Sequence, residues 1–264
     1  MKNQVSENRP VVSYEDFGAV GDGKTDDQAA IAKAHAFANE RGLAVKADDQ
    51  STYFIGGGDE PIVIQTDTDF GEAEFLIDDR EVENRRSSIF EVKSRLSSFR
   101  PEGVSSLTKG QTILGGDWPQ DCLVRVENSN VKHFIRRGAN QTEGNSQTDV
   151  FLVRKGGHVD ESTPIQWDFD EITSMIAFPV DAGTLTLSGG RFTTIANAAE
   201  SKYNYYARGI FVRRANVVIE GLEHRITGEG EHGAPYRGFI HIVDSFDVTV
   251  RDSTLSGHKT YRTI

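Results

Sequence analysis

The sequence predicts an all-β fold, a parallel β-helix in which successive coils of short strands stack on one another, preceded by a single capping α-helix. One amphipathic helical pattern near the N-terminus is followed by a long chain that carries strand-like patterns only. In that chain, alternating apolar pairs recur after 32 and then 31 residues, at 185/187, 217/219 and 248/250. A near-constant period of this length is typical of a solenoid whose coils each carry one long loop.

The helix is expected from the glycine-rich segment 13–42. Thr25 and Gln28 have the spacing of a capping box, and the two aspartates between them place negative charge at the helix start. Gly42 is the expected C-cap. We expect the apolar face of the helix to cover the open end of the coils, because solenoids need a terminal cap with a polar outer surface. That face consists of Ala30, Ile31, Ala34, Phe37 and Ala38.

Residues 16–27, DFGAVGDGKTDD, resemble the N-terminal signature of right-handed parallel β-helix proteins of the pectate-lyase superfamily. This group includes polygalacturonase-like hydrolases, uronan lyases and phage tailspike depolymerases. The resemblance covers residues 13–45 closely, and weaker coil-like patterning covers the rest. It implies a right-handed solenoid that acts on a polysaccharide and, if the protein is tailspike-like, forms a homotrimer. Function lies in sites grafted onto folds, so the resemblance does not choose the reaction.

We expect one domain. Residues 1–12 are predicted to form an N-terminal extension and residues 13–264 a single β-helix, since solenoids exceed ordinary domain size. The last two residues resemble the start of a further strand, and we therefore expect the β-helix to be C-terminally incomplete.

Strand candidates alternate with turns along the chain. Residues 93–112 are polar and predict an excursion from the coil. Trp118 and Trp167 are candidate sugar platforms, although the alternation of Ile165, Trp167 and Phe169 favours a buried role for Trp167. The strand candidates are residues 43–45, 53–55, 62–64, 75–77, 88–92, 113–114, 123–126, 131–135 and 150–153.

Charge and composition exclude several partners. The formal net charge of −11 argues against nucleic acid, because phosphate binding relies on clustered Lys and Arg. The single cysteine, Cys122, excludes an intrachain disulfide. No apolar run reaches transmembrane length and the N-terminus has no apolar signal region, so we expect no membrane partner. We expect an extracellular or periplasmic protein lacking its signal peptide in this sequence, or a virion protein.

Three segments place a tyrosine and an arginine just before an apolar strand, at 206–210, 236–240 and 261–264. If the coils stack in register, these side chains form a ladder on one face. Aromatic faces suit sugar rings and arginine forks suit carboxylates, so the expected partner is an anionic, uronate-containing polysaccharide. Alternatively, the arginines pair across coils with Glu220, Asp244 or Asp252. The expected substrate-binding residues are Tyr205, Tyr206, Arg208, Tyr261 and Arg262.

Cleavage by β-elimination needs a base that removes the proton alpha to the uronate carboxylate, and a cation that stabilises the enolate charge. Glu229 and Glu231 are two residues apart, so in an extended loop they point the same way and could hold a Ca²⁺ ion. No other cofactor is expected. The candidate catalytic residues are Arg237, Lys259, His258, His232 and Tyr236.

Three alternatives remain open. Hydrolysis needs two carboxylates across the scissile bond, and Glu229 with Glu231 would supply them, with Asp244 and Asp252 in reserve. A tailspike-type depolymerase could use either chemistry. A noncatalytic glycan-binding or structural β-helix would use neither.

Overall fold

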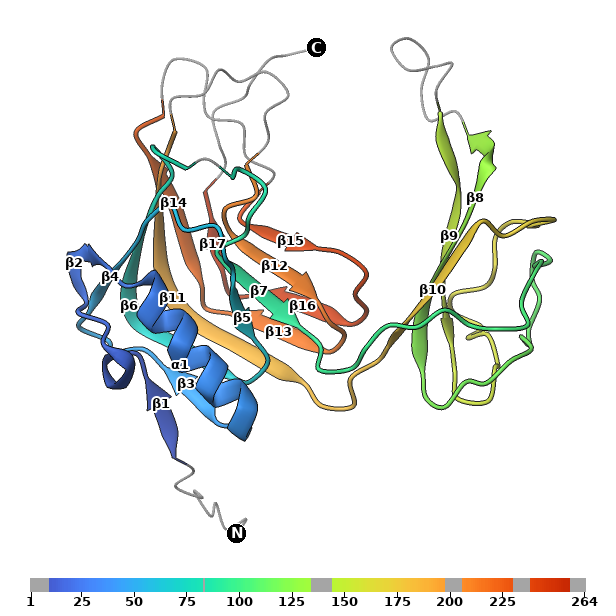
Figure 1. Ribbon diagram of the computed structural model, residues 1–264, viewed down its shortest axis with the longest axis horizontal. Helices are drawn as coiled ribbons and strands as arrows, with labels where there is room; N and C mark the ends of the chain where they lie inside the picture. Colours follow the sequence, from blue (N-terminus) through green and yellow to red (C-terminus); the bar gives the residue numbers. More distant parts are fainter. Residues whose placement is uncertain (1–9, 83, 134–143, 198–205, 230–237, 257–264) are drawn as a thin grey trace. The chain divides into compact units, whose positions relative to one another are not determined.

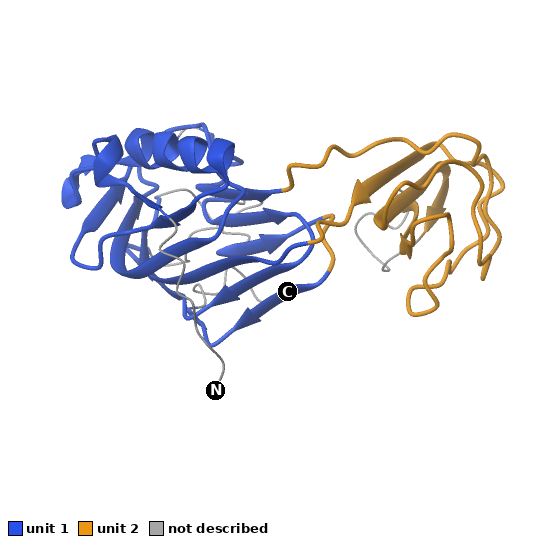
Figure 2. Ribbon diagram, turned by 90° about the horizontal axis from the view of Figure 1, so that it is seen from below, with its two compact units in different colours: residues 1–93, 183–243, 247–264 blue, residues 94–182, 244–246 orange. Residues whose placement is uncertain are grey.

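The computed structural model describes residues 10–82, 84–133, 144–197, 206–229 and 238–256. It divides into two units, each with its own hydrophobic core (Figure 2). Unit 1 comprises residues 1–93, 183–243 and 247–264, and unit 2 comprises residues 94–182 and 244–246. The expectation of a single domain over residues 13–264 is therefore corrected, because a second core lies inside that range.

Unit 1 is a parallel β-helix. Its strands pair in three parallel rows, β1-β3-β6-β11-β13-β16, β2-β4-β6-β11-β14-β17 and β5-β7-β12-β15 (Figure 1). The long strands β6 and β11 each span two rows. The strands are β1 (Val11–Ser13), β2 (Asp22–Asp26), β3 (Ala44–Lys46), β4 (Thr52–Ile55), β5 (Ile62–Ile64), β6 (Thr68–Asp78), β7 (Phe90–Lys93), β11 (Leu185–Ile195), β12 (Ile210–Arg213), β13 (Val217–Glu220), β14 (Glu223–Thr227), β15 (Ile240–Ile242), β16 (Val248–Arg251) and β17 (Thr254–Leu255).

The register of these strands confirms the repeat predicted from the sequence. Leu185 pairs with Val217, which pairs with Val248, so each spacing is one turn of the coil. The ladder extends towards the N-terminus, where Leu187 pairs with Thr68 of β6. The sequence pattern missed this earlier part because unit 2 separates β7 from β11.

The helix α1 (Gln28–Arg41) covers the first coil, as expected. Ile31, Ala34 and Ala38 are buried in the core of unit 1, and the chain leaves the helix through Gly42 in a left-handed conformation (φ 67°). The predicted N-cap is wrong. Thr25 lies in β2, one residue before the helix's flanking Asp26-Asp27 pair.

Asp26 and Asp27 take the place of the predicted capping box, and each accepts different backbone N–H groups. The Asp26 carboxylate accepts the backbone N–H of Gln28 at 3.0 Å. The Asp27 carboxylate instead accepts the backbone N–H groups of Val20 and Gly21, at 2.6 and 3.2 Å. The second aspartate therefore holds the glycine-rich loop against the start of the helix.

No helix in the described part of the chain is long and apolar enough to cross a membrane.

The interior of unit 1 contains aromatic rings at one position of successive coils. Tyr53 pairs with Phe75, which pairs with Phe192, and the last two rings stack with centroids 4.8 Å apart. His224 follows in the same row and stacks on Phe239 at 3.9 Å. Each ring fills the column above its neighbour, so the coil register and the core packing stabilise each other.

Unit 2 is built on an antiparallel sheet, in the order β10-β8-β9, and is inserted between β7 and β11. The two ends of the inserted segment 94–182 meet where Ser94 Oγ donates to Asp181 Oδ1 at 3.0 Å. The predicted excursion at 93–112 is only the beginning of this insertion. Cys122 is buried in its core, and burial raises the pKa of the thiol to about 11. The strands are β8 (Cys122–His133), β9 (Asn145–Val153) and β10 (Ser174–Pro179).

Candidate functional site

The candidate site lies where three stacked strands of unit 1 end. Asp78 of β6 pairs with Ile195 of β11, which pairs with Thr227 of β14, so the residues that follow meet at one edge of the β-helix. The segment that enters β12 contacts the loop that follows β6. The backbone N–H of Ala207 donates to the carbonyl of Arg85 in that loop, at 2.8 Å. We call residues 78–80, 195–197, 206–209 and 227–229 the loop edge.

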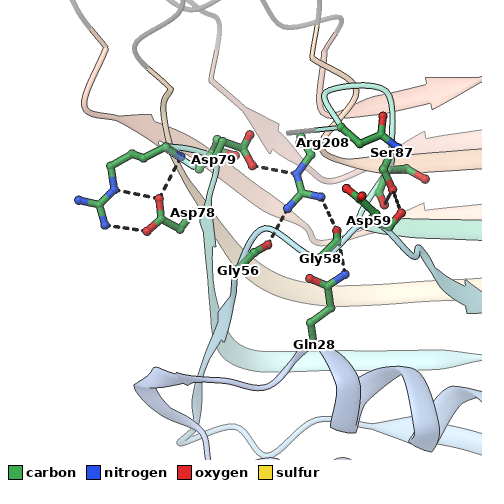
Figure 3. Close-up of polar contacts among 12 residues, drawn as sticks. Gln28, Gly56, Gly58, Asp59, Asp78, Asp79, Ser87 and Arg208 are labelled. Atoms are coloured by element: carbon green, nitrogen blue, oxygen red, sulfur yellow. Dashed lines mark hydrogen bonds and ion pairs between the residues drawn. The ribbon is translucent and has the colours of Figure 1, made fainter. Parts of the chain in front are cut away.

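A buried ion pair forms the floor of the loop edge (Figure 3). Arg208 Nε lies 2.9 Å from Asp79 Oδ1, and both side chains are 0% exposed. The same guanidinium donates to the carbonyls of Gly56 and Gly58, at 2.8 and 3.2 Å. Arg208 thereby ties the loop after β4 to the loop after β6, on separate coils.

The prediction that Arg208 binds substrate is wrong. With no exposed surface and a guanidinium bonded to three protein groups, the side chain has no access to a ligand. Strand alternation gives the reason. Arg208 has the same parity as the buried residues Ile210 and Val212, and Asp79 has the same parity as Phe75 and Ile77. This signal is present in the sequence, because Asp79 continues the alternation of the predicted strand at 75–77.

The network continues into the helical cap. Gln28 Nε2 donates to the carbonyls of Gly58 and Glu60, at 3.3 and 3.0 Å. Gly58 therefore accepts from both the first residue of α1 and Arg208, as Figure 3 shows. Gln28 of the N-terminal cap thus stabilises the loop that forms the floor of the loop edge.

Asp78 and Arg80 form a second pair on the outer side of the loop edge. Arg80 donates to Asp78 through Nε at 2.9 Å and Nη2 at 2.6 Å. These side-chain bonds hold the pKa of Asp78 below its ordinary value. Asp78 therefore stays ionised, and its carboxylate is already bonded to Arg80.

Besides Arg208, two predicted site residues lie on the described part of the loop edge. Tyr206 is partly exposed two residues before the buried Arg208. Glu229 is partly exposed after Gly228, and Ala196 donates to the Thr227 carbonyl just before it at 2.8 Å. Within the described residues, no three His, Cys, Asp or Glu side chains converge as a metal site. Calcium binding by Glu229 therefore stays a prediction.

The other predicted site residues lie outside the described residues, but two of the strands that follow them are placed. Ile210 pairs with Ile240. Counted back along the sequence, Tyr206 and Tyr236 each precede these partners by four residues, whereas Arg208 precedes by two and Arg237 by three. In the sequence, Tyr206 and Tyr236 therefore have the same offset from these paired residues, whereas Arg208 and Arg237 do not. The undescribed residues are Tyr205, Glu231, His232, Tyr236, Arg237, His258, Lys259, Tyr261 and Arg262.

Two of the acids named in the alternative prediction, Glu220 and Asp244, pair with arginines outside the three predicted Tyr-Arg segments. Arg251 Nε lies 2.8 Å from Glu220 Oε2 on the neighbouring coil. Arg125 in unit 2 binds Asp244 at 2.5 Å. These contacts satisfy the arginines with protein groups, so an arginine before or within a strand is not in itself a sign of a ligand.

The two tryptophans exchange the roles expected from the sequence. Trp118 is buried and its indole N–H donates to the Gly115 carbonyl at 2.9 Å. Trp167 is 48% exposed, whereas its neighbours Ile165 and Phe169 are buried. A bend at Trp167 interrupts the extended chain, so the alternation that predicted burial does not continue through this residue.

Comparison with known proteins gives structural likeness only. No protein-family model and no curated protein matches the chain. Among solved structures, the tailspike protein gp49 from Pseudomonas phage LKA1 matches 92% of this chain at 14% identity, with a TM-score of 0.48. The gp54 tailspike of Acinetobacter baumannii bacteriophage AP22, solved with a capsular saccharide, matches 92% at 11% identity, with a TM-score of 0.43.

A bacterial protein is also similar. PfbA, a surface adhesin of Streptococcus pneumoniae, matches 81% of the chain at 16% identity, with a TM-score of 0.31. The chain spans about half or less of each of these structures, 46%, 46% and 39% in the order given. The fold assignment rests on the strand pairing of unit 1 described above.

Proposed function

We propose that this chain binds an acidic polysaccharide along the loop edge of unit 1 and cleaves it by β-elimination. The observation that carries the proposal is the pairing of Ile210 with Ile240. This register supports a row of tyrosines at the loop edge, one coil apart, whose aromatic faces suit sugar rings. The partly exposed Tyr206 is the described member of that row.

Burial of Arg208 removes it from the residues that could hold the carboxylate of the sugar. The carboxylate of the sugar must be held by another cation, and we assign this role to Arg237 with Arg262 on the next coil. Lys259, His258, His232 and Tyr236 are the candidate bases, and Glu229 with Glu231 the candidate calcium ligands. We assign the chain to the pectate-lyase superfamily by its DFGAVGDGKTDD segment, and place it outside the cell or on a virion, where such polysaccharides occur. On a virion it would be a homotrimer.

The test is the product formed from polygalacturonate and alginate. Elimination gives an unsaturated sugar that absorbs ultraviolet light, and hydrolysis gives new reducing ends without that absorbance. We expect Arg237→Ala to lower the rate at least about 100-fold, as expected when one group that stabilises transition-state charge is removed.

Arg213→Ala is the matched control. Its side chain is 50% exposed on β12 and lies 3.6 Å from Glu91. It should leave the rate unchanged. Equal rates for the Arg237 and Arg213 variants would remove Arg237 from the site. Reducing ends without ultraviolet absorbance would replace elimination by hydrolysis, and binding without either product would leave a noncatalytic glycan-binding protein.

A further inference from the structure

We propose that Trp167 of unit 2 is a stacking platform for a sugar ring, forming a second glycan site apart from the loop edge. The proposal takes its ligand class from the proposed function but rests on different residues. Trp167 is 48% exposed in a unit whose other tryptophan, Trp118, is 2% exposed. A large apolar ring on the surface is informative because tryptophan is ordinarily buried for most of its area.

The backbone around Trp167 is held on both sides. The N–H of Gln166 donates to Asp149 Oδ2 at 2.7 Å, and the carbonyl of Asp168 accepts from Gln147 Nε2 at 2.9 Å. Asp149 and Gln147 are themselves buried on β9. Ile165 and Phe169, the next residues outward, are anchored in the core of unit 2.

The ring itself is supported by a neighbour. His133, at the end of β8, meets the indole in an edge arrangement, with centroids 5.0 Å apart and an interplanar angle of 62°. Together with the two backbone anchors, this contact fixes the orientation of the ring before any ligand arrives. A preorganised ring loses little conformational freedom on binding.

The surroundings of the ring favour a sugar over an apolar partner. Gln166 and Asp168, on either side of Trp167, are both exposed and polar. On the paired strand ends, Lys132 Nζ donates to Ser146 Oγ at 3.0 Å, and Asn145 is exposed opposite His133. A pyranose ring presents a face of C–H groups and a rim of hydroxyls, which matches one aromatic face bordered by donors and acceptors.

Tryptophan fluorescence can distinguish Trp167 from Trp118, because the chain has only these two tryptophans. Iodide should quench Trp167 and leave the buried Trp118 unaffected. We expect polygalacturonate, alginate, hyaluronan or dextran oligosaccharides to protect Trp167 from iodide. We expect Trp167→Ala to weaken binding of the protective glycan to unit 2 about tenfold, which corresponds to about 1.4 kcal/mol.

Two variants serve as controls in the full chain. Trp118→Phe should keep the protection, and Ile113→Ala, which truncates another exposed apolar side chain in unit 2, should keep the affinity. Arg237→Ala should lower turnover at least about 100-fold but leave protection of Trp167 intact, so failure at the loop edge is distinguishable from failure here. No protection by any of the four glycans, or equal affinity for the Trp167 and Ile113 variants, would overturn the proposal.

Discussion

Units 1 and 2 place their side chains by different rules. In unit 1, a residue's surroundings follow from its position in the coil, so Leu185, Val217 and Val248 become neighbours although each is a full turn from the next. In unit 2, the surroundings depend on hairpin pairing and on single bends, such as the one at Trp167. The comparison shows that a repeated coil can be recognised from spacing, whereas an inserted antiparallel unit cannot.

The largest expected effect tests the claim that Arg208 is a structural residue of unit 1. Arg208→Ala leaves the carboxylate of Asp79 buried without its counter-charge, and should lower the free energy of unfolding of unit 1 by about 3–5 kcal/mol. Denaturant unfolding followed by circular dichroism would measure it. Arg213→Ala, on the same coil but half exposed, should cost less than about 1 kcal/mol.

The paired substitution separates charge from packing. Arg208→Met combined with Asp79→Leu removes both charges and should recover much of the loss, since it leaves no unpaired ion. If Arg208→Ala cost no more than Arg213→Ala, the buried ion pair would not stabilise the coil stack, and the structural role assigned to Arg208 would be wrong.

The next expected effect is on the pH dependence of the stability of unit 1. His35 of α1 is fully buried, with Nε2 3.0 Å from the Tyr14 hydroxyl, and burial lowers the pKa of its imidazole to about 3. The unfolded chain therefore takes up this proton first. Stability from this residue is complete above about pH 6.5 and falls by up to about 1.4 kcal/mol per pH unit as the pH drops towards 3.

Replacing His35 by Gln should flatten this pH dependence, because glutamine can still bond Tyr14 but does not titrate. Urea unfolding of both proteins between pH 4 and pH 7, set to span roughly the range in which the unfolded histidine gains its proton, measures the difference. Parallel curves would show that His35 carries no linked proton. Among the described residues of unit 2, no histidine belongs to the hydrophobic core, so the transition of this unit should be unaffected by the substitution.

The smallest expected effect tests whether the two cores are independent. Joining Ser94 to Asp181 through a short Gly/Ser linker removes most of unit 2, and these two side chains already touch at 3.0 Å. We expect unit 1 to unfold at nearly the same denaturant concentration as in the full chain. A large drop in that midpoint, or loss of the folded state, would show that the coil stack depends on unit 2.

The sequence was sufficient for the coil and its cap, because both follow local rules. A spacing of 32 and 31 residues predicted the register, and an apolar stripe ending at Gly42 predicted the helix. The start of that helix was misassigned, since Thr25, Asp26 and Asp27 all have capping side chains and only the glycine-rich loop decides between them.

The candidate site was less predictable. Arg208 was grouped with Arg237 by proximity to a strand, although alternation with Ile210 already pointed it inward. Trp167 shows the converse, because alternation with Ile165 pointed it inward and a bend turned it out. Alternation is reliable only while the chain remains extended, and local sequence does not reveal where an inserted unit bends.

The place of unit 2 within the coil also affects synthesis of the protein. Thr68 of β6 and Leu187 of β11 are direct partners, yet 119 residues separate them. At about 5–20 residues per second, a ribosome delivers β11 roughly 6–24 s after β6. For that interval one side of β6 has no partner strand, and its open backbone groups could pair with another nascent chain. The insertion therefore delays the pairing of β11 with β6 during synthesis, and the finished β-helix shows no trace of this delay.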